Sequence, residues 1–121
     1  MLIIEDDPGL QETLVTVAQE LGYETRVGST AEEGLNLAAT FKPTLIFCDV
    51  HLTEGDGRRV LVQLRADEQL GDCQFVLMTG DWVGASRQTS IEIEADGYLA
   101  KPFTVVEFIA SVEERYRQAN L

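Results

Sequence analysis

Basic residues are scarce in this chain, and long apolar runs are missing. Nine lysines and arginines stand against 21 aspartates and glutamates, so the formal net charge is −12. A surface of that sign repels phosphate backbones, and we therefore expect no direct nucleic acid partner. No apolar run approaches the roughly 20 residues that a membrane-spanning helix needs, and no charged-then-apolar leader precedes the first apolar segment. These absences predict a cytoplasmic location and no membrane partner.

Cysteine and proline are also rare. Cys48 and Cys73 are the two cysteines, which are too few for a disulfide framework and lack the spacing of a metal-binding motif. There are three prolines, and no low-complexity or linker-like stretch interrupts the chain. With 121 residues, 45% of them hydrophobic, the chain is long enough to bury a core. We expect residues 1–121 to form one domain in which both cysteines are reduced.

Strand-like and helix-like segments alternate along the chain. The apolar runs that predict strands are Leu2–Ile4, Tyr23–Val27, Thr44–Cys48, Phe75–Met78 and Tyr98–Ala100. Apolar residues at helical spacing predict helices within Leu10–Leu21, Leu35–Phe41, Val60–Leu64, Val83–Ala95 and Val105–Tyr116. The alternation predicts an α/β protein with a five-stranded, doubly wound parallel sheet and five helices on two faces.

Local signals mark the starts of three helices. Asp7-Pro8 combines a capping residue with a proline for the first turn. Ser29–Glu32 resembles a capping box, and Thr104 with Glu107 forms a second one. The segment Val83–Ala95 is the exception, because it is poor in helix formers.

Polar residues follow four of the predicted strands directly. They are Glu5-Asp6, Asp49, Thr79 and Lys101. The carboxyl ends of parallel strands meet at one edge of a doubly wound sheet, where ligands bind. We therefore expect three carboxylates, one hydroxyl and one ammonium group to converge there. A single aspartate after a strand is more often a turn or cap residue, but a second pair of acids at the same edge favours a functional site.

The expected chemistry follows from this set of groups. Three neighbouring carboxylates repel one another, and a hard cation such as Mg²⁺ (or Mn²⁺) relieves the repulsion through oxygen ligands. Lys101 offers a positive charge for phosphate oxygens, and Thr79 offers a hydroxyl donor. Phosphoryl transfer needs mainly positioning and charge stabilisation from a protein. The arrangement supports an aspartyl phosphate on Asp49.

Four motifs carry a resemblance to a known family. They are Ile3-Ile4-Glu5-Asp6-Asp7, Cys48-Asp49-Val50, Met78-Thr79-Gly80 and Lys101-Pro102-Phe103. The separations are 43 residues from Asp6 to Asp49, 30 from Asp49 to Thr79 and 22 from Thr79 to Lys101. In this order and at these intervals the motifs resemble the receiver domain of two-component response regulators, over essentially the whole chain. The resemblance implies the flavodoxin-like strand order 2-1-3-4-5.

The resemblance also implies roles for the acidic residues. Asp49 is similar to the phosphoacceptor of the family. Glu5 and Asp6 are similar to the acid pair that holds Mg²⁺ together with Asp49, and the backbone carbonyl of His51 would be a further ligand.

Three further residues have implied roles in signalling. Lys101 would contact the phosphoryl group. The peptide bond between Lys101 and Pro102 is cis in the family. Thr79 would move toward the phosphoryl group after transfer, and Tyr98 matches the aromatic residue that turns inward when the threonine moves. The alternative for Tyr98 is an edge-strand tyrosine that packs on a helix.

Three features depart from the common pattern of the family. Thr53 stands where the family commonly has proline, and we expect this to loosen the loop after Asp49. His51 and Asp81 lie two residues past Asp49 and Thr79, at positions that the family uses to tune phosphoryl lifetime. The segment Val83–Ala95, weak in helix formers, belongs to the signalling face of the family.

We therefore interpret the chain as a signalling switch and not as a turnover enzyme. A histidine kinase or phosphotransfer protein would donate the phosphoryl group, with at most self-catalysed transfer and slow autodephosphorylation by the chain itself. The added charge would alter a surface near the last two strands and helices, which would bind an effector domain or a second copy. The sequence fits a stand-alone regulator and a piece of a longer one equally well.

Three other functions compete with this interpretation. A phosphatase of the haloacid dehalogenase type also uses an aspartyl nucleophile, but it needs a second aspartate where this chain has His51. A flavodoxin-like cofactor carrier shares the fold, but Glu5-Asp6-Asp7 would repel the phosphate of its ligand. A receiver that no longer accepts phosphate is the third, and Thr53 is the residue that keeps it open.

Overall fold

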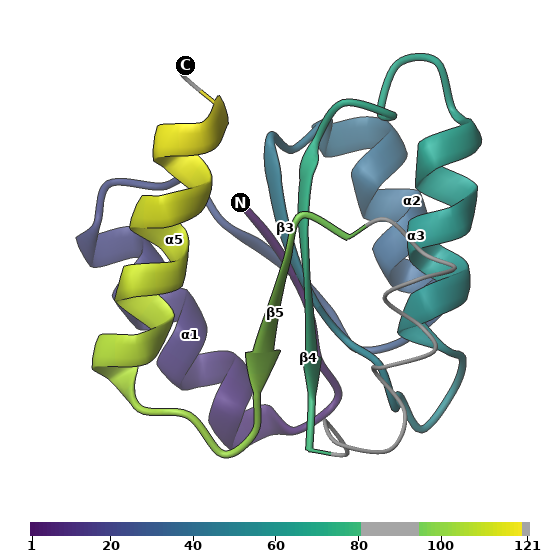
Figure 1. Cartoon of the computed structure of the whole chain (residues 1–121). Coiled ribbons are helices and arrows are strands. Elements are labelled where there is room, and N and C mark those ends of the chain that lie inside the picture. Colours follow the sequence, from purple (N-terminus) through teal and green to yellow (C-terminus); the bar gives the residue numbers. More distant parts are fainter. Residues whose placement is uncertain (81–94, 120–121) are drawn as a thin grey trace.

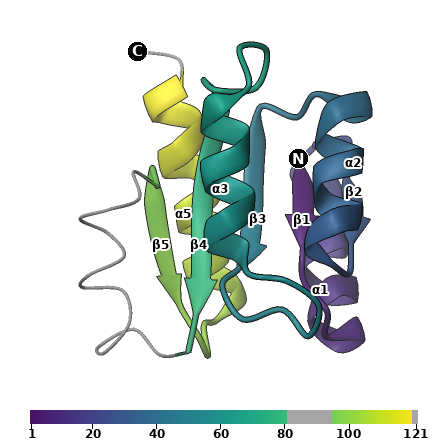
Figure 2. The ribbon, with the colours of Figure 1, turned by 90° about the vertical axis from the view of Figure 1, so that its right-hand side faces the viewer.

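A five-stranded parallel sheet forms the centre of the molecule (Figure 1). The computed structural model describes residues 1–80 and 95–119. Its strands are β1 (Leu2–Ile4), β2 (Arg26–Gly28), β3 (Leu45–Asp49), β4 (Gln74–Thr79) and β5 (Gly97–Ala100). They lie in the order β2-β1-β3-β4-β5 and are all parallel, so the predicted sheet and strand order are confirmed. Figure 2 shows the strand arrows pointing in one direction.

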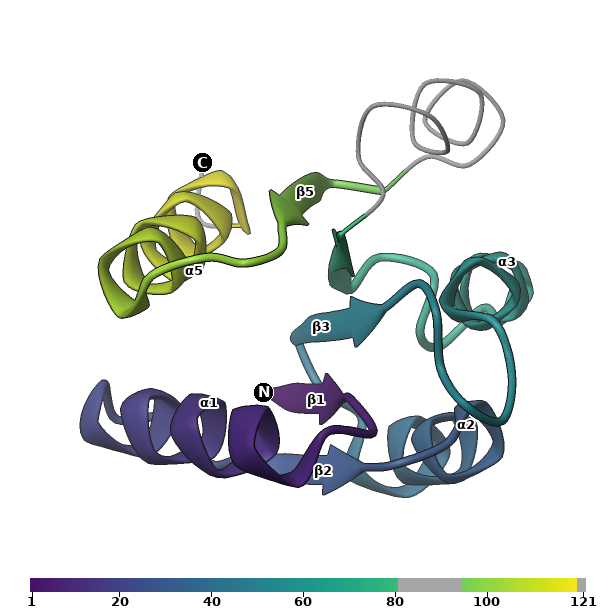
Figure 3. The ribbon, with the colours of Figure 1, turned by 90° about the horizontal axis from the view of Figure 1, so that it is seen from below.

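Helices cover both faces of the sheet, as predicted. The described helices are α1 (Pro8–Glu20), α2 (Ala31–Phe41), α3 (Gly57–Ala66) and α5 (Val105–Ala119). Figure 3 shows α1 and α5 on one face and α2 and α3 on the other. The predicted helix at Val83–Ala95 lies outside the described residues except for Ala95, which is not helical. Within the described ranges, no helix combines the length and apolar character that crossing a membrane requires.

The strands are buried on both faces, which explains why they read as unbroken apolar runs. In β3, Ile46 and Cys48 pack toward α2 and α3, whereas Leu45 and Phe47 pack toward α1 and α5. Successive side chains of a strand point to opposite faces, so one apolar run supplies two cores. A fully buried strand at the middle of the sheet therefore delivers the residue at its end, Asp49, to the sheet edge.

The second strand begins later than the sequence predicts. The prediction was Tyr23–Val27, but β2 pairs with β1 over three residues only, from Arg26 to Gly28. Tyr23 lies before the strand, donates its backbone N–H to the carbonyl of Ala18, and packs against the core on the α1 and α5 side. Its alternation with polar neighbours resembled a strand pattern, but an edge strand is only as long as the neighbour it pairs with.

The helix caps agree with the predictions in part. Thr104 and Glu107 form a complete capping box, in which each side chain accepts the backbone N–H of the other residue. The predicted box at Ser29–Glu32 is wrong by one residue, because Thr30 is the N-cap of α2 and its hydroxyl accepts from Glu33. Asp7 occupies the N-cap position of α1, but its side chain makes no capping hydrogen bond.

Candidate functional site

Three acidic side chains meet at the carboxyl edge of the sheet. Within the part of the chain that the structure describes, Glu5, Asp6 and Asp49 each contribute one carboxylate oxygen to a group of three oxygens that lie within 4.8 Å of one another. Glu5 and Asp6 follow β1, and Asp49 ends β3, the neighbour of β1. Glu5 is 0% exposed and Asp49 is 6% exposed. The predicted convergence of the three carboxylates is present.

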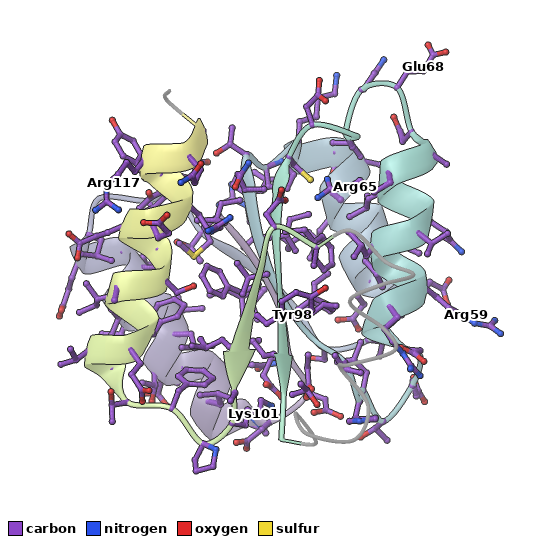
Figure 4. All side chains as sticks on the ribbon, viewed as in Figure 1. Arg59, Arg65, Glu68, Tyr98, Lys101 and Arg117 are labelled. Carbon is purple, nitrogen blue, oxygen red and sulfur yellow. The ribbon has the colours of Figure 1, made fainter. Side chains whose placement is uncertain are left out.

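Lys101 reaches this group from the end of β5 (Figure 4). Its Nζ lies 2.5 Å from Glu5 Oε1 and 3.0 Å from Asp49 Oδ2. The ammonium group is shared between two buried carboxylates. The lysine side chain is 24% exposed, so part of it stays open to solvent. The peptide bond between Lys101 and Pro102 is cis, as the resemblance implies.

The electrostatics of the site are unbalanced toward negative charge. Burial raises the pKa of Glu5, and the nearby Asp49 raises it further, although a hydrogen bond from Lys101 acts in the opposite direction. Burial opposes the charged form of Lys101, but hydrogen bonds to Glu5 and Asp49 outweigh burial and raise the pKa of the lysine. One ammonium group for three acids leaves a charge that a divalent cation would neutralise.

Asp6 has a different environment from the other two acids. Its Oδ2 accepts hydrogen bonds from the backbone N–H of Thr53 at 2.6 Å and from the Thr53 hydroxyl at 2.5 Å. The hydroxyl is the main reason that the pKa of Asp6 is below its ordinary value. The sequence predicted that Thr53 would loosen the loop after Asp49. The contacts show the reverse, because Thr53 ties this loop to the residue after β1.

The loop after β3 also contacts Asp49 itself. The backbone N–H of His51 donates to Asp49 Oδ1 at 3.1 Å, so both oxygens of Asp49 have a partner. The side chain of His51 is exposed, as expected for one pointing to solvent. The role of the His51 carbonyl as a metal ligand stays a prediction.

The two residues with predicted switch roles lie on neighbouring strands. Thr79 ends β4 and is buried, and its carbonyl accepts the backbone N–H of Lys101 at 2.8 Å. Tyr98 lies in β5 opposite Leu77, and it packs against the core on the α2 and α3 side. Figure 4 shows Tyr98 away from the end of β5 at which Lys101 lies. Asp81, the position predicted to tune phosphoryl lifetime, lies outside the described residues.

A hollow gives access to the lysine side of the site. It has a volume of about 530 Å³ and is lined by Asp7, Leu10, Gly80, Lys101, Pro102 and Phe103. The start of α1 and the segment after β5 therefore form two walls beside the ammonium group.

Gly57 positions the backbone of Asp49, and the sequence analysis did not identify this role. Gly57 is the first residue of α3, and its N–H donates to the carbonyl of Val50 at 3.0 Å. A Cβ at this position would lie 2.1 Å from the backbone oxygen of Asp49 and 2.9 Å from its carbonyl carbon. The available signal was a glycine directly after the capping residue Asp56, where a helix gains nothing from glycine.

We expect Gly57→Ala to lower the free energy of unfolding by about 1–3 kcal/mol, the usual loss on overpacking a site that cannot expand. Gly9→Ala is the matched control, because Gly9 also lies in a first helical turn and its nearest neighbour would be Asp7 Oδ1 at 3.8 Å. That variant should be slightly more stable than the wild type, since alanine is favoured over glycine in helices by about 0.5–1 kcal/mol. Urea denaturation measures both. Equal stability of the two variants would contradict the close approach of α3 to Asp49.

Comparison with known proteins agrees with the geometry. The family model described as the response regulator receiver domain matches residues 1–113. The DNA-binding dual master transcriptional regulator RpaA of Synechocystis sp. is 31% identical over 120 residues, which are 99% of this chain and 50% of RpaA. The chain thus spans about half the length of this relative, and the same holds for PhoP of Bacillus subtilis.

Solved structures share the fold. The non-phosphorylated HemR receiver domain of Leptospira biflexa is 28% identical with a TM-score of 0.85, covering 94% of this chain and 90% of that one. The receiver domain of the sensor histidine kinase PA1611 from Pseudomonas aeruginosa, with a magnesium ion in its active site cleft, is 23% identical with a TM-score of 0.84, covering 93% of each chain. The strand order, the acidic cluster, the lysine beside it and the family match all lead to the same conclusion. The chain belongs to the response regulator receiver domain family of two-component signal transduction.

Proposed function

We propose that Asp49 accepts a phosphoryl group from a phosphohistidine of a histidine kinase or phosphotransfer protein. The observation that carries this proposal is the contact of a buried carboxylate, Asp49, with the ammonium group of Lys101 inside a cluster of acids. In the reaction the P–N bond of the donor breaks while a P–O bond to one Asp49 oxygen forms. A receiver domain is a regulatory domain, so the phosphatase and the flavodoxin-like carrier are set aside.

The chain's own residues would prepare Asp49 for this reaction. Lys101 neutralises part of the charge between Glu5 and Asp49, which lets an anionic phosphoryl group approach two buried carboxylates. The hollow beside Lys101 leaves an open side for the donor. After transfer, the same ammonium group would hold the new phosphoryl oxygens, and Thr79 and Tyr98 would act as the switch.

The three acids are suited to a Mg²⁺ or Mn²⁺ ion. Their donors are all oxygens, and one oxygen of each acid lies within 4.8 Å of the others, near the separation of about 4.2 Å between opposite ligands of an octahedral ion with metal–oxygen distances near 2.1 Å. Glu5, Asp6, Asp49 and the carbonyl of His51 would hold the ion. When bound, the ion would neutralise charge on the incoming phosphoryl group. The magnesium ion named for the PA1611 receiver domain supports this choice of ion.

The remaining parts of the proposal concern the domain as a unit. Residues 1–121 would form one receiver domain, located in the cytoplasm, with slow autodephosphorylation. An effector domain or a second copy would bind to the surface formed by β4, β5, α5 and the segment between β4 and β5. The absence of direct nucleic acid contact stays a prediction from the net charge of −12, because the DNA binding named for RpaA belongs to a protein of which this chain spans half.

Labelling with acetyl phosphate tests the proposed chemistry. In the presence of Mg²⁺ we expect one phosphoryl group per chain, detected by intact mass spectrometry. When EDTA removes the ion before acetyl phosphate is added, we expect no label. An aspartyl phosphate is stable in acid and is removed by base or hydroxylamine. A Mg²⁺-independent label, or a label that resists hydroxylamine, would contradict the proposal. A folded protein that takes no label at all would be a receiver that no longer accepts phosphate.

A further inference from the structure

Thr53 makes a double hydrogen bond to one acid of the cluster. Its backbone N–H and its hydroxyl both donate to the same oxygen of Asp6, at 2.6 and 2.5 Å. Thr53 is exposed, lies 47 residues from Asp6 in sequence, and belongs to the loop between β3 and α3. Two donors from one residue on one oxygen are more than is needed to close a surface loop.

The other two acids have different partners. Lys101 contacts Glu5 and Asp49, whereas the main hydrogen bonds to the Asp6 carboxylate come from Thr53, with smaller contributions from Glu5 and from the backbone of Asp6 itself. The orientation of Asp6 is therefore set by the loop after β3. Partners of this kind, which hydrogen-bond a metal ligand and fix its direction, contribute strongly to metal affinity in proteins.

The oxygen count limits how Asp6 can bind a cation. Each carboxylate oxygen offers about two lone-pair positions, and Thr53 occupies both positions of Oδ2. With both positions of Oδ2 occupied, at most Oδ1 would bind a metal ion, so Asp6 would ligate through one oxygen. Mg²⁺ takes six ligands in near-ideal octahedral geometry and suits one-oxygen ligation, whereas Ca²⁺ takes six to eight ligands and often binds both oxygens of a carboxylate.

We propose that Thr53 is a positioning residue that restricts Asp6 to one-oxygen ligation and thereby favours Mg²⁺ over Ca²⁺. The inference rests on the proposed metal site and deepens it by naming what sets its ion preference. A merely structural hydrogen bond would stabilise the loop without any effect on the choice between the two ions.

Isothermal titration of the protein with MgCl₂ and, separately, with CaCl₂ tests the proposal. Thr53→Val keeps the backbone N–H and the shape of the side chain but removes the hydroxyl. We expect its Mg²⁺ dissociation constant to rise about tenfold, the lower end of the loss seen when an outer hydrogen bond to a metal ligand is removed. Its Ca²⁺ dissociation constant should stay the same or fall. Thr53→Ser, which restores the hydroxyl, should bind both ions as the wild type does.

Two more variants complete the experiment. Thr53→Pro removes both donors, so its loss of Mg²⁺ affinity should be larger than that of Thr53→Val. Thr40→Val is the matched control, because Thr40 is also exposed and bonded through its hydroxyl to backbone carbonyls, but lies on α2 and not among the site residues. It should change neither titration.

The outcomes separate this inference from the proposed function. A wild-type protein that binds no Mg²⁺ would overturn the metal site and the inference with it. A wild type that binds Mg²⁺ while Thr53→Val binds it equally well would overturn the inference alone. If Thr53→Val weakened the binding of Mg²⁺ and of Ca²⁺ equally, or if Thr53→Ser did not bind as the wild type does, the role of Thr53 would be structural only.

Discussion

Replacing Asp49 with asparagine is expected to abolish the acetyl phosphate label and, without Mg²⁺, to raise the free energy of unfolding, because it relieves charge repulsion inside the acidic cluster. The label is lost because an amide has no anionic oxygen with which to attack phosphorus. The gain in stability has a separate origin. Asp49 is buried beside two other acids, and its charge is one of the reasons that the pKa of Glu5 is raised.

The balance of charges decides the sign of the stability change. Asparagine removes the repulsion of Asp49 by Glu5 and Asp6 together with the unfavourable burial of a charge. It also removes one attraction, the 3.0 Å contact with Lys101, but Lys101 keeps its 2.5 Å contact with Glu5. The amide oxygen can still accept the backbone N–H of His51. We expect the two repulsions and the burial penalty together to outweigh this one attraction.

Urea denaturation with and without Mg²⁺ measures the stability, and intact mass measures the label. Asp72→Asn is the control, because Asp72 is exposed and lies before β4, at the opposite edge of the sheet. It should accept the label and stay within about 0.5 kcal/mol of the wild type. A label that survives Asp49→Asn would refute Asp49 as the acceptor. A metal-free variant that is less stable than the wild type would show that the attraction to Lys101 dominates.

The sheet and the acidic cluster could be predicted from the sequence because their signals are local. Strands buried on both faces are unbroken apolar runs, and the acids and the lysine stand directly after such runs. Parallel pairing then brings residues from distant parts of the chain to one edge without any further information. Strand order places Lys101 at the same edge as Glu5 and Asp49, 96 and 52 residues away, but β4 lies between β5 and β3, so the contacts also need the long lysine side chain.

What the sequence could not predict depends on contacts between loops. Nothing near Thr53 indicates that it donates to Asp6, because both are short polar residues in segments without a repeating pattern. The close approach of Gly57 to the backbone of Asp49 has the same character. The start of β2 at Arg26 depends on the length of β1, with which it pairs. The predicted cap of α2 was one residue too early, because Ser29 and Thr30 are both good capping residues and the structure uses Thr30.

Phe108→Ala is expected to cause the largest loss of stability, about 3–5 kcal/mol, as for other buried aromatic residues changed to alanine. Phe108 is 0% exposed near the start of α5, and its ring packs edge-on against Phe47 with centroids 4.9 Å apart. The ring of Phe103 stacks on its other side at 6.3 Å. Alanine would leave a cavity between α5 and β3 that two rings and the sheet backbone cannot fill.

Val106→Ala on the same helix separates this cavity from a general effect on α5. Val106 is 74% exposed, so its truncation should change the free energy of unfolding by no more than about 0.5 kcal/mol. Urea denaturation of both variants gives the comparison, and a loss under 1 kcal/mol for Phe108→Ala would contradict the packing of α5 on β3. Where Phe108→Ala remains fully folded it should still take one phosphoryl group. The contacts that join Lys101 to Glu5 and Asp49 do not involve the ring. Stability from this core and reactivity at the sheet edge are thus expected to be separable.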